Sequence, residues 1–146
     1  MIEVEFNLFT DFNQFVVFDS SRANWGNDLW TDQELEAMFI QGDGYITVGT
    51  RRRFSAPVTV RVLEGDAPAV KADKTQRGTL SIPSGVLEVS GVSDNGLSGG
   101  KLTVEPGEYS VRVDYLNLDS VDEDEIEGDD RYIVTLQRLA PDSDAG

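Results

Sequence analysis

Apolar and polar residues alternate along most of this chain, and this pattern constrains the fold more than any other feature. A period of two places the apolar side chains on one face of a β-strand, whereas it would scatter them around a helix. Phe15-Val16-Val17-Phe18 is apolar on both faces, which favours a buried strand. Segments with a strand pattern are residues 2–8, 15–18, 45–48, 58–62, 79–82, 86–92, 101–105, 109–115 and 132–137.

Turn-forming residues separate these segments. Pro83-Ser84-Gly85 and Pro106-Gly107 suit tight turns, and Asn95-Gly96 is the preferred sequence of a type I′ turn. Short strands at this spacing predict a mainly β fold, an antiparallel β-sandwich of about eight or nine strands with one short α-helix.

The segment from Leu102 to Val111 carries a further signal. Pro106-Gly107 turns the chain, and Tyr109 opens the next strand. The arrangement resembles the corner of immunoglobulin-like sandwiches, where a tyrosine hydroxyl fixes the crossing between the two sheets. A plain hairpin fits the same residues equally well.

The sequence predicts one helix after residue 30. Thr31 and Glu34 form the pattern of a capping box, and Trp30 and Leu35 have the spacing of a hydrophobic staple. Gly42 is the residue at which such a helix could end. The shared apolar face would consist of Leu35, Met38 and Phe39.

Length and composition bound the class of protein. A chain of 146 residues predicts one domain, residues 1–140, followed by a flexible tail at 141–146. The absence of cysteine and histidine excludes disulfides and a Ser-His-Asp triad, and it removes the usual ligands of zinc. The N-terminus does not resemble a signal peptide, and no apolar run has the length of a membrane span. We therefore expect a cytoplasmic protein without metal or cofactor.

The segment from Asp119 to Asp130 is the most distinctive candidate site. It contains eight acidic residues and no basic one, in a chain of formal net charge −15. It could be a solvated connection, a docking surface for a basic protein, or a calcium site whose spacing departs from that of an EF-hand. Our predicted partner-binding residues are Asp122, Glu123, Asp124, Glu125, Glu127, Asp129 and Asp130 of this segment, together with Trp25.

Other candidates have simpler explanations. Arg51-Arg52-Arg53 is too short to bind nucleic acid on so acidic a chain, and pairing with nearby acids explains it better. Trp25 and Trp30 could bind a partner or a sugar, although core packing is the commoner role of an indole. The many carboxylates show no pair in a readable motif for glycoside hydrolysis, so we predict no catalytic residue.

Five segments together resemble the competence protein J family, inhibitors of the nuclease that acts in bacterial DNA uptake. They are Phe15-Val16-Val17-Phe18, Leu29-Trp30-Thr31-Asp32, Asp43-Gly44-Tyr45-Ile46, the segment Leu102 to Tyr109, and Tyr132-Ile133-Val134. The resemblance implies a small β-rich intracellular inhibitor that binds a nuclease and performs no catalysis. It identifies no inhibitory residue.

The sequence thus predicts a non-enzymatic acidic protein that binds and inhibits a basic partner, namely a nuclease, as a nuclease inhibitor or as an immunity-type protein against a toxin nuclease. Direct contact with nucleic acid or membrane is not expected, because an anionic surface repels phosphate. The alternative is a β-sandwich module that binds carbohydrate or calcium. A third possibility is that the charge serves only solubility.

Overall fold

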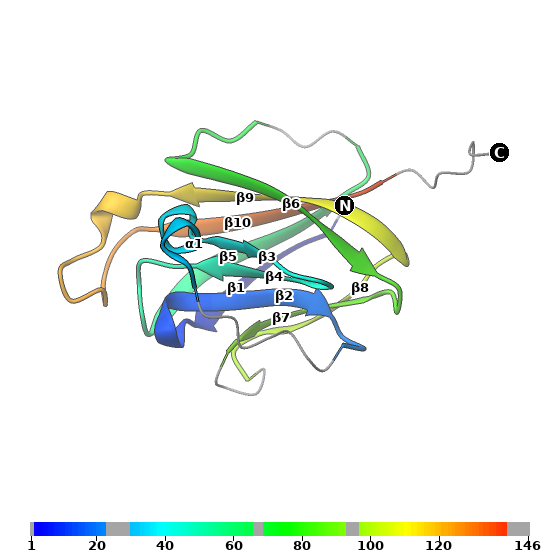
Figure 1. The fold of residues 1–146 in the computed structure, drawn as a ribbon, viewed down its shortest axis with the longest axis horizontal. Helices are drawn as coiled ribbons and strands as arrows, with labels where there is room; N and C mark the ends of the chain where they lie inside the picture. Colours follow the sequence, from blue (N-terminus) through cyan, green and yellow to red (C-terminus); the bar gives the residue numbers. More distant parts are fainter. Residues whose placement is uncertain (1, 23–29, 66–68, 93–96, 140–146) are drawn as a thin grey trace.

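A computed structural model describes residues 2–22, 30–65, 69–92 and 97–139, which form ten strands in two five-stranded sheets (Figure 1). The strand order of the first sheet is β1 (Ile2–Phe9), β5 (Ser55–Leu63), β10 (Arg131–Arg138), β9 (Gly107–Leu116) and β6 (Lys74–Ile82). The order of the second sheet is β3 (Phe39–Gln41), β4 (Tyr45–Gly49), β2 (Gln14–Asp19), β7 (Val86–Gly91) and β8 (Gly100–Thr103).

The two sheets bury one hydrophobic core between their inner faces, so the predicted mainly β fold is confirmed. Alternate residues of each strand point into this core, as their period of two requires. The first sheet contributes Leu8, Val58, Val60, Val111, Val113, Val134 and Leu136, and the second contributes Phe15, Val17, Ile46, Val48, Leu87 and Val89.

Strand β2 is buried on both faces, as its apolar run predicts. Val16 and Phe18 point away from the main core into a second cluster, which also contains Ile40 and Tyr45. Trp30 packs against this cluster and shields it from solvent. The outer face of the second sheet is therefore partly covered.

One strand pair departs from the predicted antiparallel arrangement. β10 pairs with β9 in antiparallel fashion but with β5 in parallel, with Tyr132 opposite Val58 and Gln137 opposite Leu63. The strand signals could not reveal this, because alternation fixes the buried face of a strand and not the direction of its neighbours.

The chain crosses between sheets at the segment that resembles an immunoglobulin-like corner. It leaves the second sheet after β8 and enters the first sheet in β9, so a plain hairpin is excluded. The Tyr109 hydroxyl donates a hydrogen bond to the carbonyl oxygen of Glu105 (2.6 Å), and burial raises the pKa of this phenol. The tyrosine corner is therefore present.

Helix α1 (Asp32–Ala37) begins as predicted but ends early. The Thr31 N–H donates to Glu34 Oε1 (2.9 Å) and the Glu34 N–H donates to Thr31 Oγ1 (3.1 Å), which completes the capping box. The helix does not continue to Gly42, because Met38 adopts a left-handed conformation (φ 58°). The Met38 carbonyl oxygen accepts hydrogen bonds from the Tyr115 hydroxyl (2.5 Å) and the Gly49 N–H (2.8 Å).

Phe39, expected on the helix, therefore belongs to strand β3. No helix within the described ranges is long and apolar enough to cross a membrane. The predicted Asn95-Gly96 turn and the tail at 141–146 lie outside the described residues.

Candidate functional site: an acidic end of the sandwich

Three connections meet at one end of the sandwich, which we call the acidic end. They are residues 10–13 between β1 and β2, residues 50–54 between β4 and β5, and residues 117–130 between β9 and β10. Figure 1 shows this end at the left, where the orange loop before β10 lies beyond the sheets. Each connection is held in place because the strands on both sides of it are paired within the sheets.

Hydrogen bonds join the three connections to one another. The Thr50 N–H donates to the Asn13 carbonyl (2.8 Å), and the Asn13 side-chain amide donates to the Arg51 carbonyl (3.1 Å). The same amide donates to Glu125 Oε1 (3.3 Å), and the Arg53 N–H donates to the Glu125 carbonyl (2.9 Å). Segments far apart in the sequence thus form one surface.

The acidic loop, residues 117–130, has a defined internal structure. The Asp122 N–H donates to the Glu127 carbonyl (2.9 Å), and Asp122 Oδ1 accepts from the N–H groups of Ile126 (3.0 Å) and Glu127 (3.3 Å). The Asn117 side-chain amide donates to the Asp129 carbonyl (3.1 Å) and closes the base of the loop. The hydrogen bond from the Ile126 N–H is the main cause that lowers the pKa of Asp122, which favours its charged form.

Most of the predicted partner-binding carboxylates are exposed on this loop. Within the described part of the chain, none of these exposed carboxylates forms an ion pair with a lysine or arginine. Their charges are not neutralised there and together produce a concentrated negative potential. They are Asp122, Glu123, Asp124, Glu125, Glu127 and Asp129.

Asp130 requires a correction, because its side chain is fully buried and is not part of the exposed surface. Arg52 Nε donates to Asp130 Oδ1 (2.5 Å), and the Tyr132 hydroxyl donates to Asp130 Oδ2 (2.5 Å). The Arg51 N–H in turn donates to the Tyr132 hydroxyl oxygen (2.8 Å). Burial, together with the hydrogen bond to Asp130, raises the pKa of Tyr132, so the phenol stays protonated. The arginine triplet thus pairs with a nearby acid through Arg52.

The two tryptophans have different positions. Trp25 lies outside the described residues. Trp30 is half-buried, and its indole N–H donates to Gln14 Oε1 (3.1 Å) while its ring packs on the second apolar cluster. The main role of the Trp30 ring is therefore to pack against the second apolar cluster.

Sequence reasoning missed a group of exposed apolar side chains at the acidic end. Their exposed fractions are large: Phe12 70%, Leu35 58%, Phe54 50% and Ile126 40%. The only sequence signal was Asp11-Phe12-Asn13, an aromatic residue flanked by turn-forming residues between two strands. Arg53 lies over the Phe54 ring, 5.1 Å from its centroid. Apolar groups beside unpaired charges are typical of surfaces that bind other proteins.

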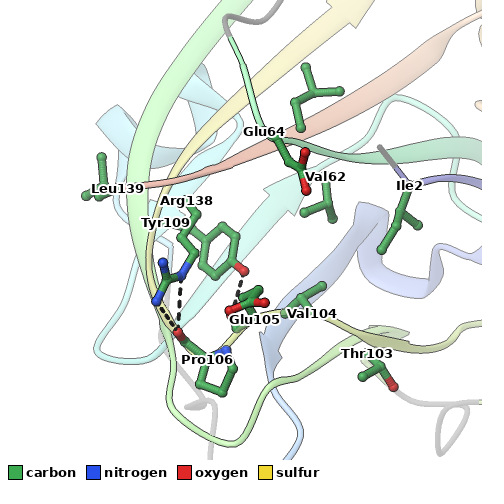
Figure 2. Close-up of a pocket in the computed structure, with 11 residues that line it drawn as sticks. Ile2, Val62, Glu64, Thr103, Val104, Glu105, Pro106, Tyr109, Arg138 and Leu139 are labelled. Atoms are coloured by element: carbon green, nitrogen blue, oxygen red, sulfur yellow. Dashed lines mark hydrogen bonds between the residues drawn. The ribbon is translucent and has the colours of Figure 1, made fainter. Parts of the chain in front are cut away.

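A cavity lies at the other end of the sandwich. It measures about 690 Å³, and apolar side chains such as Ile2, Val62 and Leu139 line it beside Arg138. Figure 2 shows the Arg138 guanidinium donating to the Pro106 carbonyl (3.2 and 2.9 Å), next to the Tyr109 corner. The acidic loop comes directly before β10, and Leu139 comes directly after it. The eight-residue strand therefore separates the acidic loop from Leu139 by about 25 Å.

The acidic residues of the described ranges do not converge as metal ligands would. No group of three or more acidic side chains there has the geometry to hold a metal ion. The exposed carboxylates point to solvent, and two of the loop acids, Asp122 and Glu125, bind protein N–H groups. The geometry therefore suits the attraction of a cationic surface more than the coordination of an ion.

The fold and this end of it define a class: a two-sheet β-sandwich that displays unpaired carboxylates on an ordered loop. The chain belongs to the Competence protein J (ComJ) family, whose family model matches residues 7–137. The predicted family resemblance is confirmed.

Two solved structures resemble this chain in fold. One is ComJ of Bacillus subtilis, an inhibitor of the DNA-degrading activity of NucA, with a TM-score of 0.70 and 16% identity over 95% of this chain and 96% of that chain. The other, described as crocagin biosynthetic gene J, has a TM-score of 0.56 and 18% identity over 96% of this chain and 100% of that chain. A search of curated proteins finds no significant match.

Proposed function

We propose that this chain is a non-enzymatic inhibitor that binds a basic protein, namely a nuclease. Membership of the Competence protein J family supports this, as does the fold shared with an inhibitor of a DNA-degrading enzyme. The observation that carries the proposal is the set of exposed loop carboxylates that have no ion-pair partner among the described residues.

The proposed mechanism is occlusion of the DNA-binding cleft. A nuclease that binds DNA must present a cationic groove, because phosphate contacts supply much of its affinity. The carboxylates of the acidic loop take the place of phosphates in that groove, on a scaffold with no bond for the enzyme to cleave. Trp25 remains a predicted contact of the same interface.

The loop offers acidic residues whose side chains have no hydrogen bond or ion pair in the described structure, so they can be neutralised without loosening the loop. We select Glu123→Gln, Asp124→Asn and Glu127→Gln, which leave Asp122 and Glu125 in place. The matched control, Glu5→Gln, Glu64→Gln and Glu105→Gln, removes the same charge from other exposed sites.

The experiment measures association with a basic nuclease from the same organism at about 50 mM and 500 mM salt. The loop variant should associate roughly tenfold more slowly at low salt, and the difference should shrink at high salt because screening removes the steering effect. Equal losses in the loop and control variants would assign the effect to net charge alone and contradict the proposal. Absence of any complex at low salt would also contradict it.

A further inference from the structure

The Phe12 side chain is exposed to solvent, and the Phe12 backbone is strained. It adopts a left-handed conformation (φ 61°, ψ 22°) inside the 3-10 turn η1 (Asp11–Asn13), and its side chain is 70% exposed. A bulky residue in this conformation is an outlier, since glycine, asparagine and aspartate are the residues that tolerate it. Backbone strain of this kind concentrates at functional sites.

Hydrogen bonds on both sides of Phe12 hold the turn in this conformation. The Asn13 N–H donates to the Thr10 carbonyl (2.9 Å), and the Thr10 N–H donates to the Phe54 carbonyl (3.1 Å). The Phe12 side chain is 70% exposed, so buried packing explains little of its identity. An asparagine would satisfy the backbone better, so the fold alone gives no reason for an aromatic residue here.

A groove of about 280 Å³ lies beside Phe12, and we call it the anchor groove. Side chains from η1, from helix α1 and from the segment before it line the groove, and its floor reaches the end of β4. The volume suits one large side chain rather than a drug-sized ligand. The principal apolar lining residues are Phe12, Trp30, Leu35 and Met38.

The groove adjoins the acidic loop, and two acidic residues of α1 flank Leu35, which lines the groove. Asn13 lines the groove and binds Glu125 of the loop through its side-chain amide (3.3 Å). Asp32 and Glu36 are exposed beside Leu35 on α1, and neither forms an ion pair with a described lysine or arginine. An apolar side chain carried by a cationic surface is complementary to this arrangement.

We propose that the anchor groove receives one apolar or aromatic side chain of the basic partner, next to lysine or arginine residues that face the acidic loop. This rests on the proposed function and adds the short-range part of recognition. Charge steers the partner toward the acidic end, and burial of the anchor side chain against Phe12 and Leu35 then sets the lifetime of the complex.

The test uses Phe12→Asn and Leu35→Gln, with Leu139→Gln as the control at the opposite end. Asparagine relieves the strain at position 12, and glutamine keeps helix propensity at position 35. The dissociation constant for the nuclease should rise about tenfold or more for each groove variant, at both low and high salt, because apolar burial is not screened. Leu139→Gln should bind as the unsubstituted chain does.

Thermal unfolding separates binding from folding. Phe12→Asn should unfold at the same temperature as the unsubstituted chain or a few degrees higher, since it removes strain without removing packing. If its melting temperature falls by several degrees, Phe12 has a structural role, and the binding of Leu35→Gln alone decides the proposal: normal binding by that variant rejects it. Leu35→Gln keeps the binding test decisive in that case, because the Leu35 side chain is largely exposed.

Fluorine NMR gives an independent readout. The chain contains two tryptophans, so labelling with 5-fluorotryptophan gives two signals, and a Trp25→Phe variant serves only to identify the signal of Trp30 in the unsubstituted chain. Binding of the nuclease should shift the Trp30 signal, since this indole lines the groove.

The two proposals fail in different ways. If the nuclease binds and the loop variant is weakened while both groove variants bind normally, only the anchor groove is rejected. If the unsubstituted chain binds no nuclease, the inhibitor function itself is rejected and the groove proposal falls with it.

Discussion

At the scale of single residues, the acidic end depends on one buried carboxylate rather than on the exposed ones. Asp130 pairs with Arg52 and accepts a hydrogen bond from Tyr132, so it joins the loop to the connection at 50–54. Tyr132 also stacks edge-on against Tyr115, with ring centroids 5.9 Å apart. The composition predicted the negative charge, but sequence alone could not separate this acid from its exposed neighbours, because only the fold brings Arg52 to it.

Removal of Arg52 tests this role. Arg52→Met should destabilise the protein by about 3–5 kcal/mol, because it leaves a buried carboxylate without its counter-charge. Arg53→Met, an exposed neighbour, should change stability by less than about 1 kcal/mol. Urea unfolding at neutral pH measures both. A loss equal to that of the control would mean that Asp130 does not depend on this pair.

The contribution of Asp19 to the stability of the protein should depend on pH. Burial raises the pKa of this carboxyl, but hydrogen bonds from the side chain and N–H of Ser21 and of Ser84 outweigh burial and leave the pKa lowered. Because the folded pKa lies below the unfolded one, Asp19 stabilises the protein above the unfolded pKa. This contribution is lost as pH falls through the folded value.

Unfolding of Asp19→Asn by denaturant should therefore show less stability at pH 7 and a weaker decline below about pH 4 than the unsubstituted chain. Asp43→Asn is the control, because its exposed pair with Arg22 at 3.6 Å should contribute little. An unchanged acid limb in Asp19→Asn would contradict the assignment.

At the scale of elements, the sequence predicted those structural features that depend only on residues close together in the chain. The capping box of α1 and the corner at Tyr109 both depend on residues within a few positions, and both are present. The end of α1 was not predictable, because the Met38 carbonyl binds Gly49 and Tyr115 from distant strands. Those contacts outweigh the helical pattern and place Phe39 in β3.

The acidic loop has its own structural requirement at Gly128. A Cβ atom there would lie 2.9 Å from the Val121 Cα atom, so any larger residue must displace the loop backbone. Gly128→Ala should weaken binding to the nuclease and speed amide exchange at Asp122, although no charge changes. Gly65→Ala is a suitable control, because a Cβ there would meet no atom within 4 Å. Normal binding by Gly128→Ala would show that the loop conformation is not needed.

At the scale of the whole molecule, the fold gathers charge and apolar surface at one end. Alternation in the sequence predicted two packed sheets, but it did not show that residues 10–13, 50–54 and 117–130 would meet. That meeting follows from the parallel pairing of β5 with β10 and from the crossings between sheets, which no local pattern encodes. The sequence did not predict the exposure of Phe12 beside the acidic loop for the same reason, since a lone aromatic residue in a turn does not indicate which residues surround it.

The proposed occlusion requires that the acidic end occupy the site where the nuclease binds DNA. A competition experiment tests this requirement. A catalytically inactive nuclease is titrated with this protein at constant salt, and the titration is repeated at increasing concentrations of double-stranded DNA. The apparent dissociation constant should rise in proportion to the DNA concentration, and no ternary complex should form. A stable complex of nuclease, DNA and this protein, with affinity unchanged by DNA, would contradict the proposed occlusion.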